Sequence, residues 1–131
     1  MSTRNERLTA FVAAGASLPF VWGASDCTIW VADWVFSETG IDLAAGRRSS
    51  YTSALGCRRM LQRAGGLPLL VADLMARAGF AETDAPLVGD VGLIETAAGP
   101  MMAISTGERW ALKTADGVAV IAADPLKMWR I

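Results

Sequence analysis

Residues 20 to 27 read Phe20-Val21-Trp22-Gly23-Ala24-Ser25-Asp26-Cys27 and stand directly before a strongly apolar segment. Ser25 and Asp26 are residue types that begin helices, because their side-chain oxygens accept hydrogen bonds from the free backbone N–H groups of the first turn. Apolar residues then occur on every side of the following turns: Ile29, Trp30, Val31, Trp34 and Val35. This pattern is typical of a helix enclosed by the rest of a fold. The stretch therefore predicts a central helix with Cys27 in its first turn.

The predicted position of Cys27 at a helix start affects the pKa expected for its thiol. Free N–H groups and the helix dipole at a helix start favour a thiolate, which is how many thiol enzymes lower the pKa of a cysteine. The thiolate also needs a neighbouring base, normally histidine, to take and return the proton. The chain contains no histidine, so it cannot perform Cys–His catalysis alone. We favour a structural role for Cys27, since free cysteine is among the residue types most often buried.

Three further helices are expected in the first eighty residues. Thr3 and Glu6 have the spacing of a capping box, and the helix they begin is expected to end near Gly15. The other two helices are expected at Thr52 to Ala64 and at Leu69 to Ala78, each followed by glycine. The intervening segments, Ala16 to Ala24 and Glu38 to Ser50, are expected to be a short lead-in and a loop.

The pattern changes to short strands from Val91 onward. Five runs are expected to be strands: Val91–Glu95, Met101–Thr106, Trp110–Lys113, Val118–Ala122 and Met128–Ile131. Turn signals separate them at Ala98–Gly99–Pro100, Gly107, Asp116–Gly117 and Asp124–Pro125. Helices followed by strands indicate an α+β fold in which the helices pack on one side of a small antiparallel sheet. The absence of a linker or repeat predicts a single domain over residues 1–131.

The composition of the chain argues against several classes of function. A chain of 131 residues with 53% hydrophobic and 19% charged residues is expected to fold around one core. The net charge of −1 and the lack of a basic stripe argue against nucleic-acid binding. We expect no membrane span, no signal peptide and synthesis in the cytoplasm. Cys27 and Cys57 are then expected to be free thiols, Cys57 in a packing role, and no metal or other cofactor is expected.

The quoted octapeptide resembles the start of the cysteine helix in NlpC-type cell-wall peptidases of the papain-like superfamily. Gly89-Asp90-Val91, which opens the strand region, is also similar to that family. The C-terminal Trp129-Arg130-Ile131 resembles the ending of a subgroup of small proteins encoded among phage tail genes. The resemblance follows most of the chain in order: cysteine helix, further helices, then sheet. It implies a papain-like α+β fold with Cys27 at the position of the nucleophile.

The resemblance also implies where the other catalytic residues of the family would lie. The family's histidine begins the second strand, and Met101 occupies that position here. The third polar residue lies on the following strand, where Leu112 is the best match. Neither side chain can accept a proton or orient an imidazole. Four residues are implied to border or support the groove: Trp22, Gly23, Asp26 and Asp90.

The leading hypothesis is a non-catalytic NlpC-like domain that acts as a structural or assembly component of a phage tail tip, or of a phage-derived particle. Its expected partners are other tail-tip or baseplate proteins, and its final location is the virion tail. One alternative is a peptidase or amidase acting on peptidoglycan through Cys27, with Asp90, Glu95 or a partner's histidine as base. Another is a module that binds peptidoglycan without hydrolysis.

The end of the chain has two possible interpretations. Trp129 and Arg130 are expected either to belong to a last strand within the sheet or to contact a partner. The arginines of the middle of the chain are expected to form a solvated basic edge: Arg47, Arg48, Arg58 and Arg59. Trp22 is expected to pack over the start of the central helix.

Overall fold

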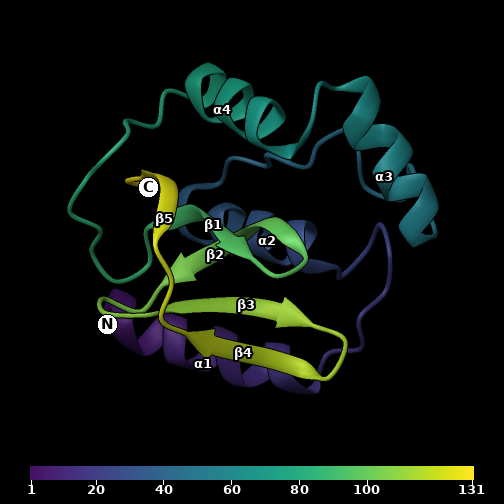
Figure 1. Ribbon diagram of the computed structural model, residues 1–131. Helices are drawn as coiled ribbons and strands as arrows, with labels where there is room; N and C mark the ends of the chain where they lie inside the picture. The colour runs from purple at the N-terminus through teal and green to yellow at the C-terminus, as the bar shows by residue number, and fades with distance from the viewer.

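The computed structural model describes all residues, 1–131, as four helices followed by five strands (Figure 1). The helices are α1 (Arg4–Ser17), α2 (Cys27–Thr39), α3 (Ala54–Arg63) and α4 (Leu67–Ala78). The strands are β1 (Val91–Thr96), β2 (Gly99–Ser105), β3 (Trp110–Thr114), β4 (Gly117–Ile121) and β5 (Pro125–Trp129). This order confirms the predicted α+β class.

Helix α1 begins as predicted but ends later. The Thr3 side chain accepts a hydrogen bond from the Glu6 N–H at 3.1 Å, and the Glu6 carboxylate accepts one from the Thr3 N–H at 3.5 Å, which completes the capping box. The helix continues through Gly15 to Ser17. A Cβ at Gly15 would lie 2.6 Å from Trp30 Nε1, so this glycine allows α1 to approach α2 closely instead of ending the helix.

Helices α2, α3 and α4 also differ from the prediction at their ends. Helix α2 extends to Thr39, so Glu38 is helical and holds Arg4 and Arg7 by ion pairs of 3.0 and 2.8 Å. Ser53 caps α3 by accepting a hydrogen bond from the Gly56 N–H at 3.0 Å. Helix α4 begins two residues earlier than predicted, with proline in its first turn, a position where a missing N–H costs nothing.

The five strands form one antiparallel sheet in the order β4-β3-β2-β1-β5. The first hairpin turns at residues 97 and 98, so Gly99 and Pro100 belong to β2 and not to the turn. The last strand starts at Pro125 and ends at Trp129, which leaves Arg130 and Ile131 beyond it. The predicted span of this strand, Met128–Ile131, was therefore wrong at both ends.

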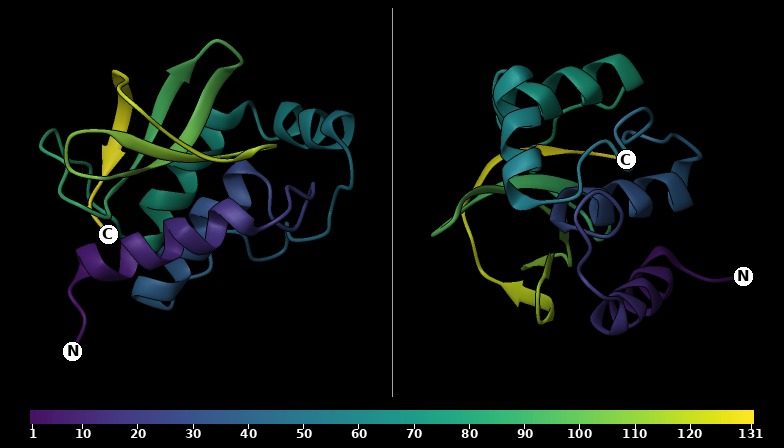
Figure 2. Two further views of the ribbon diagram at one scale, coloured as in Figure 1. Left: turned by 90° about the horizontal axis from the view of Figure 1, so that it is seen from below. Right: turned by 90° about the vertical axis from the view of Figure 1, so that its right-hand side faces the viewer.

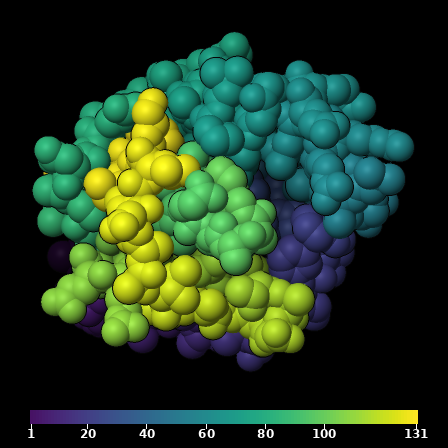
Figure 3. Space-filling model, viewed as in Figure 1, coloured from purple at the N-terminus to yellow at the C-terminus, as the bar shows by residue number.

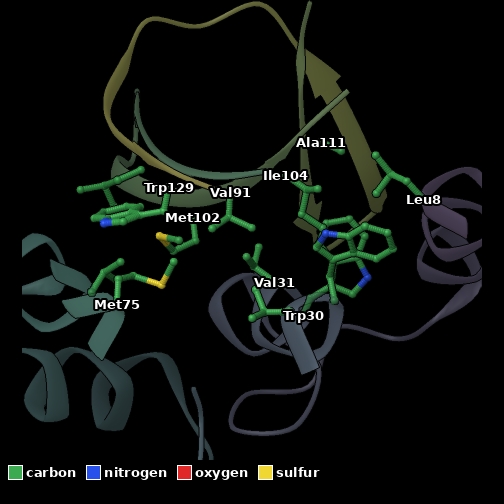
Figure 4. Close-up of a cluster of buried hydrophobic side chains, with 13 residues drawn as sticks. Leu8, Trp30, Val31, Met75, Val91, Met102, Ile104, Ala111 and Trp129 are labelled. Atoms are coloured by element: carbon green, nitrogen blue, oxygen red, sulfur yellow. The ribbon is translucent and has the colours of Figure 1, made fainter. Parts of the chain in front are cut away.

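The helices cover one face of the sheet, as predicted. Helix α2 packs on β2 and β3, α1 lies along β3 and β4, and α4 reaches β2 (Figure 2). The main core lies between these layers and draws side chains from all of them, including Leu8, Trp30, Met75, Met102 and Trp129 (Figure 4).

The opposite face of the sheet holds a second, smaller core made of Ile94, Ala103, Trp110 and Leu112. No helix contributes a buried residue to it. The sheet is curved (Figure 4), and side chains from β2, β4, β5 and the segment before β5 pack on this cluster: Met101, Ala119, Ile121, Ala123 and Met128. No helix of the structure has the length and apolarity needed to cross a bilayer.

Candidate functional site

The start of α2 is organised around the buried carboxylate of Asp26, which is 1% exposed. Its Oδ1 accepts hydrogen bonds from the N–H groups of Thr28 at 3.1 Å and Ile29 at 3.0 Å. Its Oδ2 accepts from the Gly23 N–H at 2.8 Å and from the Tyr51 hydroxyl at 2.6 Å. The predicted capping role of Asp26 is confirmed. Four donors compensate the cost of burying this charge.

Gly23 allows the loop before α2 to lie directly against the loop before α3. Its φ of +81° is in the left-handed region, and a Cβ there would collide with the carbonyl oxygen of Tyr51. The Gly23 carbonyl also accepts a hydrogen bond from the Ser49 N–H at 2.9 Å. Only glycine combines this backbone conformation with this contact. The predicted supporting role of Gly23 is therefore explained by the approach of Tyr51 to Asp26.

Cys27 is the first residue of α2, as predicted, but its surroundings do not favour a thiolate. Burial raises the pKa of the Cys27 thiol, and the Asp26 carboxylate beside it raises the pKa further. Its closest polar contact is Thr28 Oγ1, 3.8 Å from Sγ, which lowers the pKa without reversing the shift. The N–H groups of Thr28 and Ile29, which would stabilise an anion at this helix end, are already bonded to Asp26. Cys27 is thus held as a neutral thiol.

Two residues that the sequence did not point to complete this site. Tyr51 is buried, and burial together with its bond to Asp26 raises the pKa of its hydroxyl well above the ordinary value. Cys57 of α3 lies near Tyr51, and burial raises the pKa of its thiol too. The pKa values of both groups are thus raised, as is that of Cys27. No spacing rule links Tyr51 or Cys57 to Asp26, since loops of the folded chain bring them together.

Met101 and Leu112 do not face Cys27 in this structure. Both pack in the smaller core on the far side of the sheet, which contains no residue of α2. Successive side chains of a strand point to opposite faces, and Met102 is the neighbour that faces α2 in the main core. The two positions that the resemblance assigns to the lost base and the lost third residue are thus turned away from the helix that carries Cys27.

Trp22 makes an aromatic contact within the loop before α2. Its ring meets Phe20 edge to face, with ring centroids 4.9 Å apart and planes inclined by 82°. Both rings remain half-exposed on the loop before α2. Trp22 therefore forms an aromatic pair within its own loop.

Figure 3 shows a hollow between the green hairpin of β1 and β2 and the teal α3, with blue-violet atoms of the N-terminal part at its floor.

Asp90 anchors the C-terminus and does not support Cys27. Its fully buried carboxylate accepts hydrogen bonds from the Leu87 N–H at 2.8 Å, the Ile131 N–H at 3.3 Å and Arg130 Nε at 3.2 Å. The adjacent Gly89 carbonyl binds Trp34 Nε1 at 2.8 Å. Trp34 follows Cys27 by seven residues, about 10 Å along a helix. The Asp90 carboxylate is therefore engaged with the C-terminal segment, on the part of the fold that contacts Trp34.

Trp129 is internal to the fold, whereas the exposed Arg130 is fastened to it by polar contacts. Trp129 is 2% exposed, pairs with Val91 in the sheet and belongs to the main core. Arg130 binds Asp90 and also donates to the Ala85 carbonyl at 2.7 Å. Arg130 lies just beyond the strand. The last-strand interpretation is therefore confirmed for Trp129, and the tail is fastened to its own domain.

The basic residues of the middle of the chain separate into two kinds. Arg48 pairs with Asp33 at 2.7 Å and with Asp42 at 3.0 Å, which raises the pKa of its guanidinium. The other members of the basic edge, Arg47, Arg58 and Arg59, form no ion pair, and the last two are exposed on α3. No three His, Cys, Asp or Glu side chains gather in a way that would hold a metal ion.

Comparison with known proteins gives one match. No curated protein and no solved structure matches the chain significantly. A family model described as a domain of unknown function, DUF6950, matches residues 1–131. The chain therefore belongs to the DUF6950 family.

Proposed function

We propose that this protein is a non-catalytic domain built on an NlpC-type, papain-like scaffold and that it serves as a structural or assembly component of a phage tail tip or related particle. The proposal that the domain is non-catalytic rests on one observation. The N-terminus of α2, where a thiol peptidase would stabilise its thiolate, is occupied by the carboxylate of Asp26, which Tyr51 and Gly23 also hold. The phage context rests on the resemblance of the octapeptide and of the Trp129-Arg130-Ile131 ending.

The arrangement of elements supports the scaffold. A helix that begins at a cysteine packs its apolar faces against an antiparallel sheet, with the remaining helices on the same side. This is the order of elements that the resemblance implies. Fold alone does not assign an activity, so the state of the site decides the function.

The chemistry at Cys27 argues against hydrolysis. A general base typically contributes roughly 10²- to 10⁴-fold to such reactions, and the chain has no histidine. Asp90 is committed to Arg130 and the C-terminal backbone. Glu95 is an exposed residue near the tip of the β1–β2 hairpin, paired across the strands with Pro100. A base supplied in trans would still meet a thiol whose pKa is raised.

We assign assembly to the hollow face of Figure 3 and not to the C-terminal strand, because that strand pairs with β1 within the domain. A genetic replacement tests this function. The substitution is made in the phage genome that encodes the chain. Cys27→Ala is expected to give normal tails and normal infectivity, whereas deletion of the gene is expected to stop tail completion.

The outcomes separate the alternatives. Loss of infectivity with Cys27→Ala, but normal particles, would favour the peptidoglycan hydrolase. Normal tails after deletion of the gene would overturn the structural role. A pull-down of the purified protein on peptidoglycan at physiological salt is expected to retain nothing, and saturable retention without hydrolysis would favour the binding module.

A further inference from the structure

An apolar cavity of about 60 Å³ lies between α2, the loop before α3, α4 and the sheet. Ile29 and Ala32 of α2 line one side, and Val71 of α4 and Met102 of β2 line another. A cavity of about 150 Å³ with such walls stays dry and binds benzene. This cavity is smaller and suits a short alkyl group instead of an aromatic ring.

Few polar groups line this cavity, and most of them are already engaged. The Tyr51 hydroxyl is bonded to Asp26 at 2.6 Å, and Thr28 Oγ1 lies 3.8 Å from the Cys27 thiol. The remaining one is the side chain of Arg47, which lines the cavity and is half-buried. Unlike the adjacent Arg48, it has no carboxylate partner. A cation at the rim of an apolar cavity is a site for an anionic group attached to an apolar one.

The space on the other side of Arg47 is also open. A shallower hollow of about 350 Å³ is lined by Arg47, Ala64, Leu69, Leu70 and Asp73. The Asp73 carboxylate in this hollow is paired with Arg77 at 3.1 Å. Arg47 therefore lies between the apolar cavity and a more open hollow. A ligand can place its alkyl part inside and extend outward past the guanidinium.

The local charge favours an anion here. Residues 42 to 73 contain five arginines and two aspartates, although the whole chain has a net charge of −1, and the two aspartates are paired with Arg48 and Arg77. Helix α3, which carries three of these arginines, buries no residue and presents them to solvent. A concentration of one charge sign raises the local concentration of the opposite one.

We propose that the cavity beside Arg47 binds a short aliphatic chain that ends in a carboxylate. Two sources share this chemistry: a free alkyl carboxylate and an aliphatic C-terminal residue of a protein. The alkyl part fills the space between α2 and α4, and the carboxylate binds the Arg47 guanidinium. The site does not depend on the state of Cys27, so it stands or falls separately from the proposed assembly function.

Titration of the full chain with sodium pentanoate and with 1-pentanol tests the site, observed through the ¹³C-labelled methyl groups of methionine. Met60 and Met102 both line the cavity and are expected to shift saturably with both probes. Arg47→Gln is expected to weaken pentanoate about tenfold and leave pentanol unchanged, because a hydrogen bond to a charged group is lost. Arg58→Gln removes an exposed arginine outside the cavity and is the matched control, expected to change neither.

Ala32→Leu is expected to fill the cavity and abolish binding of both probes, with an unchanged circular dichroism spectrum. N-acetyl-leucine in place of pentanoate distinguishes the sources, since tighter binding of this probe indicates a protein C-terminus and weaker binding a free carboxylate. The proposal is overturned if Met60 and Met102 do not respond saturably in the wild type. It is equally overturned if Arg47→Gln and Arg58→Gln weaken pentanoate to the same extent.

Discussion

The hydroxyl of Tyr51 donates a hydrogen bond of 2.6 Å to Asp26, a residue 25 positions earlier in the chain. This bond joins the loop before α3 to the start of α2 and leaves the Asp26 carboxylate fully satisfied beside Cys27. The negative charge that caps the helix therefore occupies the place where a catalytic thiolate would be stabilised.

Removal of either partner is expected to destabilise the protein. Tyr51→Phe is expected to lower the free energy of unfolding by about 2 kcal/mol, because a hydrogen bond to a buried charge is lost. Asp26→Ala is expected to cost about 3 kcal/mol, since it leaves the cap donors and the hydroxyl without an acceptor.

Urea denaturation measures both changes. Thr52→Ala is the control, because Thr52 is exposed and its substitution should stay within about 0.5 kcal/mol. Additive effects of Tyr51→Phe and Asp26→Ala in the double variant would show that the two side chains are not coupled and would contradict the structure.

Stability is expected to fall at alkaline pH. The pKa values of Cys27, Cys57 and Tyr51 are all raised in the folded state. An unfolded thiol loses its proton near about pH 8.5 and an unfolded tyrosine near about pH 10. Above these values the unfolded state binds fewer protons than the folded state, so the free energy of unfolding decreases as pH rises.

Urea denaturation between pH 7.5 and 10.5 checks this dependence. Tyr51→Phe should reduce the slope at the upper end of the range. A free energy of unfolding that rises over this interval would mean that the three groups ionise more easily in the folded protein.

Lys113 is a buried cation whose removal is expected to be costly. It is 1% exposed, and its Nζ donates to the carbonyl oxygens of Leu18 at 2.6 Å and Gly117 at 3.2 Å. Leu18 is the residue that ends α1, where a positive charge also complements the helix dipole. Lys113→Met keeps the shape and loses these bonds, so we expect a loss of about 3 kcal/mol.

The control for Lys113 is Lys127→Met. Lys127 is exposed and pairs with Glu82 at 3.1 Å on the surface, so its replacement should cost less than about 1 kcal/mol. Equal effects of the two substitutions in thermal or urea denaturation would contradict the role of Lys113 at the end of α1.

Met101→His is expected to leave the alkylation rate of Cys27 unchanged. Met101 packs with the smaller core on the face of the sheet away from α2, so an imidazole there cannot reach the thiol. The rate is measured with iodoacetamide between pH 5.5 and 8. Faster labelling of the variant at low pH would mean that β2 is shifted by one residue, which reverses the two faces of a strand.

Much of the fold could be predicted from local patterns. The capping residues Thr3 and Asp26 mark two helix starts, and Gly79 marks a helix end, because these signals depend only on neighbouring backbone groups. The order of helices and strands follows from the change in periodicity at Val91. The prediction that α1 ends near Gly15 is wrong because this glycine serves a tertiary contact, the close approach of Trp30.

The orientation of β2 could not be predicted in the same way. Residues 101 to 104 are all apolar, and both faces of the sheet are covered by apolar cores. Alternation therefore gives no sign of which face meets α2. The bond between Tyr51 and Asp26 and the burial of Lys113 are likewise products of the fold, and lysine is a residue type rarely expected inside.

The pH dependence of Cys27 alkylation tests the central claim most directly. The measurement uses the Cys57→Ser variant, in which Cys27 is the remaining thiol, with a Cys27→Ser variant to verify the assignment. Burial and Asp26 raise the pKa of Cys27, so we predict slow labelling at neutral pH and a midpoint above about 8.5, the value of an ordinary thiol. Fast labelling with a midpoint below about 7, as in activated cysteines, would contradict the account and indicate a nucleophile.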